Sequence, residues 1–529
     1  MKKYTQSYIN SELCTNNLLL TGLHKSLEMD IVENIRDAPY ESILARREIN
    51  FDMEKKALDT VKKFLIRKKL VLYGGMAMDM AFRLKGSRLY DPTDNKLEDY
   101  DFYSPDPIND AYELADILHK EGFLEVNAIN ALHVTTMRVR LGTKAVADIS
   151  YIPPNIFKVI PTLKFKDSNH EEDTYIIINP LFQRIDLHES LTEPVRDAPT
   201  EVYFNRFAKD IKRFKMLDEL YPINEYLPKK SPKIELVDVI IPNLSDVLWV
   251  GCISYAIHYK QLFDLIGSSS KIHKKFQSEF DNILELSITQ LDQDSKDLYV
   301  QTPKSTPLSL YADDFPTVLK ELGEQYSKSS ISYYNTYLDR SRPRMIKFVK
   351  KRKSGGDIEI FDNARSTKTY IDVKVGSVNM KGASAQLTLM YFLQRYFEHG
   401  NDIDLIFYYN TLNIVKLTEL ILVDMAEEKS ESSRKQFLNK QMDNLTMFIC
   451  NKWYGKYNLG DSFSISMQYI VSNNKSEKLD PMRARSYWPS DGKKPINDIK
   501  NMHPYHIDGK ETEPFKPVGD GWLNDIKLK

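Results

Sequence analysis

The sequence predicts an α+β fold, in which a mixed sheet with helices is followed by helical regions and a C-terminal α/β domain. A short apolar strand over 69–73 ends at Gly74-Gly75 and leads into a helix-forming segment over 76–84. A second strand over 97–103 carries two aspartates, and residues 133–151 read as a hairpin. A mixed sheet with helices on one face is the compact arrangement for elements in this order.

The length of 529 residues indicates about three domains. We expect an N-terminal helical region over 1–68 and the mixed-sheet domain over 69–200. A helical middle region over 201–325, an α/β domain over 326–475 and an extended tail over 476–529 complete the expected order.

Composition excludes several classes of protein. With 28% charged and 42% hydrophobic residues and a net charge of −1, the chain reads as soluble and globular. Its three cysteines form no CxxC pair, which argues against structural zinc and disulfides and for a reducing compartment. The first residues lead into no apolar run, so we expect no signal peptide. The apolar stretch 239–259 contains Pro242, Asp246 and Gly251, which favours a buried helix pair over a membrane span.

The remaining elements follow from local signals. Leu58, Val61 and Leu65 lie on one face of a helix that ends near Lys68. Asn109 or Asp110 is expected to cap a helix that runs to Lys120 and stops at Gly122. Residues 133–141 and 145–151 alternate in polarity around a Gly142 turn, as paired strands do. A longer amphipathic helix is expected over about 202–221.

The acidic residues predict a metal site. Alternate residues of a strand point the same way, so Asp99 and Asp101 share one face, while Asp148 lies in a later strand. Converging carboxylates repel one another unless cations lie between them. Gly74 and Gly75 have no Cβ, which lets the backbone N–H groups approach a phosphate. Two Mg²⁺ ions about 3.5–4 Å apart would hold a nucleotide triphosphate and lower the pKa of an attacking hydroxyl.

Each part of this pattern also has an ordinary explanation. An isolated Asp-x-Asp is usually a solvated turn, and Gly-Gly usually marks a tight turn. The pattern becomes specific because a strand ends at the glycines, a helix follows, and the third acid comes from a later strand within about 50 residues.

Basic residues form two candidate nucleotide or RNA contacts. One is a helix face with Arg206, Lys209, Lys212 and Arg213, which could equally be solvated. The other is the densest basic run, which includes Arg340, Arg342, Arg344, Lys347, Lys350 and Lys351. Apolar residues interleave with these cations, which favours RNA contact over a basic surface loop.

Three weaker candidates stand beside them. The stretch 184–189 could line the cleft, although a structural turn is the simpler interpretation. Trp488 and Trp522 in the tail could stack bases, with ordinary loop packing as the alternative.

At Gly74-Gly75, Asp99-x-Asp101 and Asp148 the sequence resembles the DNA polymerase β-like nucleotidyltransferase superfamily. The wider run from Leu72 to Tyr151 is similar to the poly(A) polymerases of large cytoplasmic DNA viruses, of the mimivirus type first and the poxvirus catalytic subunit more distantly. The resemblance implies a nucleotidyltransferase fold, with metal roles for the three aspartates and a nucleotide-phosphate role for the two glycines.

The resemblance also implies that the enzyme extends mRNA 3′ ends with ATP and two Mg²⁺ or Mn²⁺ ions. It allows a second, degenerate nucleotidyltransferase fold in the C-terminal domain, with which Gly355-Gly356 is compatible. Many superfamily members carry Ser after the first or second glycine. The sequence here is Gly-Gly-Met, so one usual phosphate-binding hydroxyl is absent.

Two other functions compete with polyadenylation: another nucleotidyl transfer, such as CCA addition or oligoadenylate synthesis, and a catalytically silent RNA-binding role. The intact set of three aspartates speaks against the silent role, and the long basic C-terminal half favours an RNA substrate. The resemblance further suggests a homodimer, and a location in the host cytoplasm, in viral factories, and in the virion.

Overall fold

The structure is a computed structural model. It describes residues 453–454, 487–491, and 51–437 apart from 92–97, 124, 132–135, 143, 153–156, 168–169, 193–199, 231, 245, 305, 313–314, 323–325, 328–330, 335–344, 353–356, 363–367, 428, 432 and 435. The expected helices before residue 51 therefore lie outside the described residues.

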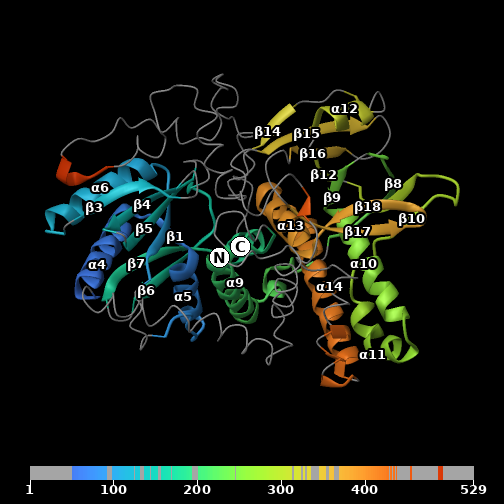
Figure 1. Ribbon diagram of the computed structural model, residues 1–529, viewed down its shortest axis with the longest axis horizontal. Helices are drawn as coiled ribbons and strands as arrows, with labels where there is room; N and C mark the ends of the chain where they lie inside the picture. Colours follow the sequence, from blue (N-terminus) through green and yellow to red (C-terminus); the bar gives the residue numbers. More distant parts are fainter. Residues whose placement is uncertain are drawn as a thin grey trace.

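The first half of the chain forms a seven-stranded mixed sheet in the order β3-β4-β5-β2-β1-β7-β6 (Figure 1). Its strands are β1 (Val71–Tyr73), β2 (Tyr100–Ser104), β3 (Val126–Asn130), β4 (Thr136–Leu141), β5 (Lys144–Tyr151), β6 (Thr162–Asp167) and β7 (His170–Ile178). Its helices are α4 (Phe51–Lys68), α5 (Gly74–Leu84), α6 (Pro107–Lys120), α8 (Pro180–Thr192) and α9 (Thr200–Leu220). The predicted fold class and the predicted hairpin are confirmed.

One face of this sheet belongs to the core. Phe102 in β2 is fully buried, and its ring lies 6.5 Å from that of Phe64 in α4. Because neighbouring residues of a strand point to opposite faces, Asp101 is directed to the face away from α4. Helix α6 packs beside α4. The prediction that Asn109 or Asp110 caps α6 is wrong: Asp106 caps it and accepts the Asn109 N–H, since Pro107 at the first position has no N–H to satisfy.

The second half builds a nine-stranded sheet in the order β13-β15-β16-β12-β9-β18-β17-β19, with β14 also paired to β15. Its strands are β9 (Val247–Val250), β12 (Leu308–Ala312), β13 (Tyr326–Ser327), β14 (Ile331–Tyr334), β15 (Met345–Arg352), β16 (Ile358–Asp362), β17 (Lys368–Val375), β18 (Val378–Ala383) and β19 (Trp453–Tyr454). Its helices are α10 (Cys252–Gly267), α11 (Ser270–Phe280), α12 (Phe315–Leu322), α13 (Ala385–His399) and α14 (Asp402–Glu427). A small separate sheet contains β8 (Leu236–Ile241), β10 (Ile288–Gln290) and β11 (Leu298–Pro303).

The two large sheets have the same topology. In each, the first strand pairs antiparallel with the second and parallel with a strand much later in the sequence: β1 with β2 and β7, and β9 with β12 and β18. The second strand then pairs parallel with a later one, β2 with β5 and β12 with β16. The C-terminal half therefore repeats the central strand topology of the first sheet. Its opening glycine is Gly251 after β9, whereas Gly355-Gly356 lies outside the described residues.

Two expectations about the middle of the chain are wrong. Residues 236–312 contain strands β8 to β12 and begin the second fold, so 201–325 is helical only in part. The stretch 239–259 contains the end of β8, the strand β9, Gly251 and the start of α10, and is not a helix pair. Short apolar runs fit either a buried strand or a buried helix, which explains the error. None of the described helices combines the length and the apolar character that crossing a membrane requires.

Helices α8 and α9 of the first half pack against α13 and α14 of the second, at the centre of the molecule (Figure 1). Arg184 is fully buried there and donates to Asp218 at 3.0 Å and to the carbonyl oxygen of Tyr221 at 2.8 Å. His188 lies between the Gln386 amide at 2.9 Å and the Tyr408 hydroxyl at 2.7 Å. The stretch 184–189 is thus helical and joins the halves, which corrects the expected turn.

A segment near the C-terminus returns to the first sheet. Tyr487 forms an antiparallel bridge with Ala128 in the edge strand β3, with N–H···O distances of 2.8 and 2.9 Å. Its ring lies 4.9 Å from that of Tyr112 in α6, and its hydroxyl donates to Asp116. The short helix η4 (Pro489–Asp491) follows beside α6, shown in red in Figure 1. The described part of the tail therefore covers a sheet edge.

The packing of α8 and α9 against α13 and α14 should become less stable in acid. Burial, and then the nearby Arg184 charge, lower the pKa of His188 to about 3, so the ring is neutral at pH 7. The folded-state pKa of His188 lies below its unfolded value. The contribution of neutral His188 to the free energy of unfolding is therefore complete above about pH 6.5 and is lost as the pH falls towards 3. We expect a loss of about 2 kcal/mol at pH 5 from this group. Thermal unfolding at pH 7 and pH 5 measures it.

The matched variants for this test are His188→Gln and, on the exposed face of α6, His119→Gln. His188→Gln should show a smaller difference between the two pH values than the wild type, and His119→Gln an unchanged one. An equal difference in all three proteins would contradict the assignment.

Candidate active site

The turn after β1 presents the backbone N–H groups at the start of α5. Gly74 has φ +71°, in the left-handed region that glycine tolerates, and it is the first residue of α5. The residue before it, Tyr73, offers no side-chain hydrogen bond to the helix start. The first N–H groups of a helix are left unpaired by the helix itself and favour an anion. This end of α5 is therefore suited to phosphate.

Strand register brings the acids to the same place. Asp101 in β2 lies opposite Tyr73 in β1 on one side and opposite Asp148 in β5 on the other. A Cβ atom on Gly74 would lie only 2.4 Å from Oδ2 of Asp101. The absence of a side chain at position 74 is thus what lets the carboxylate lie against the turn.

Asp99 precedes β2 by one residue and joins this group. Burial raises its pKa, and the charges of Asp148 and Glu98 raise it further. Since a like charge disfavours ionisation only at short range, this shift reflects carboxylates gathered in one region. The structure thus places Asp101 and Asp148 in register beside the diglycine turn, with Asp99 two residues before Asp101 and near enough to Asp148 to be affected by its charge.

A cation from the next strand already contacts this group. Arg138 in β4 lies opposite Asp148, with its Nε 2.7 Å from Oδ1 and its Nη2 2.6 Å from Oδ2. This two-point contact raises the pKa of the guanidinium. Each carboxylate oxygen has two lone pairs, so Asp148 keeps one acceptor site on each oxygen.

The donor set suits a hard divalent cation. Carboxylate oxygens are the ligands that Mg²⁺ and Mn²⁺ prefer, and Asp99, Asp101 and Asp148 lie in the region of the turn that begins α5. Among the described residues, however, no three acidic, histidine or cysteine side chains converge closely enough to enclose an ion. The site therefore fits a metal by its chemistry, and binding requires the carboxylates to close inward.

Helix α9 carries one of the predicted basic residues to the turn. The Nη2 of Arg213 donates to the Tyr90 hydroxyl at 3.0 Å, and its Nη1 lies 3.2 Å from Asp210. A Cβ on Gly75 would lie 2.1 Å from the Tyr90 hydroxyl and 2.4 Å from Nη2 of Arg213. Arg213 is therefore part of the candidate site.

The other basic candidates are placed only in part. Lys209 and Lys212 are exposed on α9, and for Arg206 only the backbone is described. Lys347, Lys350 and Lys351 lie in β15, an interior strand, so this part of the run is not a loop. Arg340, Arg342, Arg344 and Trp522 lie outside the described residues, and Trp488 is exposed beside Tyr487.

The matching position in the second half is filled by protein. Register places Ser309 where Asp101 stands and Glu359 where Asp148 stands, and Pro307 falls at the position of Asp99. Arg395 donates to Glu359 at 2.8 Å and to Asp404 at 3.3 Å.

The Tyr391 ring covers Gly251, since a Cβ there would lie 2.8 Å from its Cε1. A guanidinium and a phenol ring thus occupy the place of a ligand. Of the two turns, that at Gly74-Gly75 is the candidate active site.

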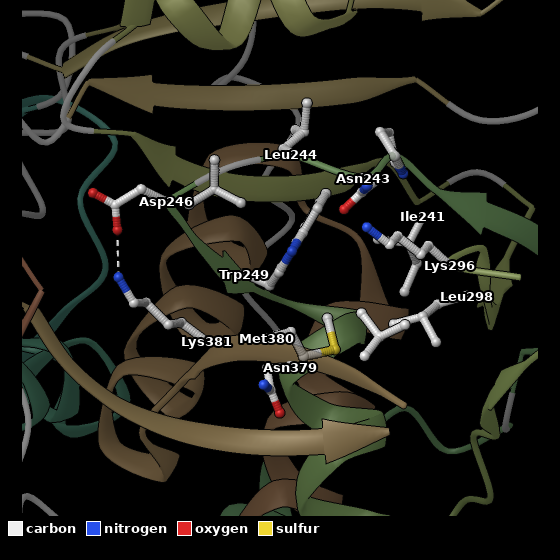
Figure 2. A pocket seen from close by; sticks show the side chains of 13 residues that line it. Ile241, Asn243, Leu244, Asp246, Trp249, Lys296, Leu298, Asn379, Met380 and Lys381 are labelled. Carbon is white, nitrogen blue, oxygen red and sulfur yellow. Dashed lines mark hydrogen bonds and ion pairs between the residues drawn. The ribbon is translucent and has the colours of Figure 1, made fainter. Parts of the chain in front are cut away.

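A cavity of about 180 Å³ in the second half is a different feature. Figure 2 shows Trp249 at its centre, with the Asp246–Lys381 ion pair closing one side. It lies at the start of β9, at the opposite end of the strand from Gly251. Ligand pockets usually measure about 300–1,000 Å³, so this cavity is small for a nucleoside triphosphate.

Two contacts at the site were missed in the sequence. Arg138 is visible only as a polar residue of an alternating strand, and its pairing depends on register with β5. Tyr90 lies 15 residues after Gly75 in the sequence and carries no motif. Only the predicted hairpin, which makes Arg138 and Asp148 cross-strand neighbours, could have indicated the first.

Comparison with known proteins agrees with this geometry. The family model described as "Poly(A) polymerase catalytic subunit" matches residues 59–197. A candidate poly(A) polymerase catalytic subunit of African swine fever virus (isolate Tick/South Africa/Pretoriuskop Pr4/1996) is 32% identical over 89% of this chain and 96% of its own length. Its counterpart in Acanthamoeba polyphaga mimivirus is 27% identical over 33% of this chain and 28% of its own length.

The fold likewise has a solved relative. The crystal structure of the Megavirus polyadenylate synthase superposes with a TM-score of 0.55 at 17% identity, and the match covers 86% of this chain and 84% of that one.

Replacing Arg138 should make the carboxylates more dependent on added cations. Arg138→Gln leaves Asp148 without its charged partner, so we expect a loss of about 1–3 kcal/mol of stability without divalent ions. Added Mn²⁺ should then raise the unfolding temperature more than it does in the wild type, because it binds the folded state alone. Thermal unfolding with and without Mn²⁺ measures both effects.

Arg140→Gln, two residues along the same strand, is the matched control, since Arg140 contacts Asn127 instead. An equal or smaller Mn²⁺ effect in Arg138→Gln than in this control would contradict the role of the three aspartates.

Proposed function

Because this chain belongs to the family of viral poly(A) polymerase catalytic subunits, we propose that it adds adenylate residues to the 3′ ends of mRNA without a template. In this reaction the RNA 3′ oxygen forms a bond to the α-phosphorus of ATP and pyrophosphate leaves. The observation that carries the proposal is the register that brings Asp101 and Asp148 beside the diglycine turn, with Asp99 two residues before Asp101.

The proposal assigns two Mg²⁺ or Mn²⁺ ions to these three aspartates. When bound, such ions neutralise phosphate charge and lower the pKa of the attacking hydroxyl. The chain itself supplies the N–H groups of Gly74 and Gly75 and the start of α5 for the triphosphate. Asp148 has acceptor sites left beside Arg138 and can take the hydroxyl proton.

RNA is the proposed second substrate, with ATP as the nucleotide. The exposed Lys209 and Lys212 of α9 lie on the helix that carries Arg213, so they are candidates for RNA phosphate contacts near the turn. The filled site of the second half supports a single catalytic centre per chain. The low cysteine content suits a reducing compartment such as the host cytoplasm.

Extension of an RNA primer with each of the four nucleotides tests the reaction. We expect strong preference for ATP, and we expect Asp101→Ala to lower extension by more than about 100-fold, since even residues that only support metal ligands cost 10–100-fold. RNA binding should survive, because the carboxylate does not contact RNA in the proposal.

Asp238→Ala, an exposed carboxylate in β8, is the matched control. Normal extension by Asp101→Ala would refute the metal assignment. Equal use of all four nucleotides, or addition limited to CCA, would refute polyadenylation.

Self-association is a separate part of the proposal. A polymerase that works without a partner subunit can retain RNA by pairing two basic surfaces, since binding at two linked sites raises the overall affinity. We expect light scattering at micromolar concentration to give twice the 61.5 kDa mass of the chain. A monomer mass under these conditions would remove the homodimer.

A further inference from the structure

We propose that the Tyr90 hydroxyl is a phosphate-binding group for ATP and takes the place of the side-chain hydroxyl that position 75 lacks. This inference rests on the proposed function and adds to it a substrate-binding residue outside the glycine and aspartate motifs. It follows from the space around Gly75, from the contacts that hold Tyr90, and from two unused donors.

The space beside Gly75 is filled by a hydroxyl. A Cβ built on Gly75 would lie 2.1 Å from the Tyr90 oxygen, and a serine hydroxyl lies about one bond length beyond its own Cβ. Gly75 is not among the glycines with positive φ, so its backbone would accept a side chain. Only lack of space excludes a side chain such as that of serine at position 75. The group that fills this space, the Tyr90 hydroxyl, is of the same chemical type.

Helix α5 fixes where Tyr90 lies. The buried Asp79 in α5 accepts the N–H groups of Leu89 at 2.8 Å and Tyr90 at 3.1 Å. On the other side, Arg213 donates to the Tyr90 hydroxyl, and Asp210, which also accepts from Ser190 at 2.7 Å, holds Arg213. Tyr90 is thus held from both ends against the helix whose first turn it faces.

Two donors remain for an anion. The Tyr90 oxygen accepts from Arg213, so its own proton is free to be given, and burial raises its pKa to about 12, which keeps that proton in place at neutral pH. The Nε of Arg213 is buried and has no hydrogen-bond partner among the described residues. A buried donor without a partner costs free energy, and a phosphate oxygen would satisfy it.

The position of these donors selects the triphosphate over the RNA backbone. The Tyr90 hydroxyl and the Arg213 guanidinium lie beside Gly75 at the N-terminal end of α5, next to the turn against which Asp101 lies. If the phosphates of a nucleotide bind at the turn, their charged oxygens lie next to the Tyr90 hydroxyl and the Arg213 guanidinium. The exposed lysines of α9 are better placed for RNA.

Tyr90→Phe tests the assignment, with Tyr299→Phe in β11 as the matched control. Equilibrium binding of ATP with Mg²⁺, and of adenosine and an RNA primer, is measured for each protein. Loss of a hydrogen bond to a charged group should weaken ATP binding and raise its KM about tenfold, with adenosine and RNA unchanged. An ATP affinity within twofold of the wild type, or an equal loss for adenosine, would overturn the inference.

A double-mutant cycle adds a test that does not depend on loss alone. Gly75→Ser should bind ATP poorly, because its side chain meets the Tyr90 oxygen, while Arg213 can move its flexible end. In the Tyr90→Phe background the same serine should restore ATP affinity above that of either single variant. Losses that simply multiply in the double variant would overturn the exchange of one hydroxyl for the other.

The experiments distinguish failure of the phosphate contact at Tyr90 from failure of the proposed polyadenylation. If Asp101→Ala abolishes extension and Tyr90→Phe binds ATP normally, the inference fails and the proposed function stands. If the wild type binds ATP through Tyr90 but adds no adenylate to RNA, the proposed function fails and the phosphate contact stands.

Discussion

Repulsion among three carboxylates is the constraint around which the first half of the chain is organised. Asp101 and Asp148 lie opposite each other in two adjacent strands, so strand register sets the separation of their backbones, and Asp99 precedes the first of these strands by one residue. Burial of Asp99 makes the gathered charge costlier still. Arg138 on the third strand and Arg213 on α9 offset part of this cost with fixed positive charge. Because a bound cation also relieves the repulsion among these carboxylates, it stabilises this site more than it would stabilise a site without such repulsion.

The second half has the same strand arrangement around Gly251, but different side chains occupy the positions of the three aspartates. The topology, the glycine with positive φ and one strand carboxylate are kept, at Gly251 and Glu359. Ser309 and Pro307 remove the other two charges, and Arg395 neutralises the remaining carboxylate by a direct contact. The Tyr391 ring then fills the space over the turn. The repeated fold packs against the first half through α13 and α14.

The sequence predicts those parts of the site that depend on local pattern. A strand that ends in two glycines, a following helix and a polar–apolar hairpin are each legible within about 20 residues, and they place both glycines and the three aspartates. Contacts set by tertiary structure are not legible in this way. Tyr90 reaches Gly75 only because Asp79 turns the chain back along α5, and Arg213 arrives from a helix more than 100 residues later. The repeated topology was expected in the C-terminal domain, but its start was not found at Gly251. Gly251 is a single glycine without an acidic pair, and the apolar strand before it also fits a helix.

Strand β3 would be an open edge of the catalytic sheet if Tyr487 did not pair with it. Unpaired edges of this kind recruit strands from other molecules and promote aggregation. The backbone bridge of Tyr487 to Ala128 therefore protects this edge from pairing with another molecule. Proteolytic loss of the chain beyond residue 486 would leave the candidate active site in place and yet remove the pairing that Tyr487 gives to β3.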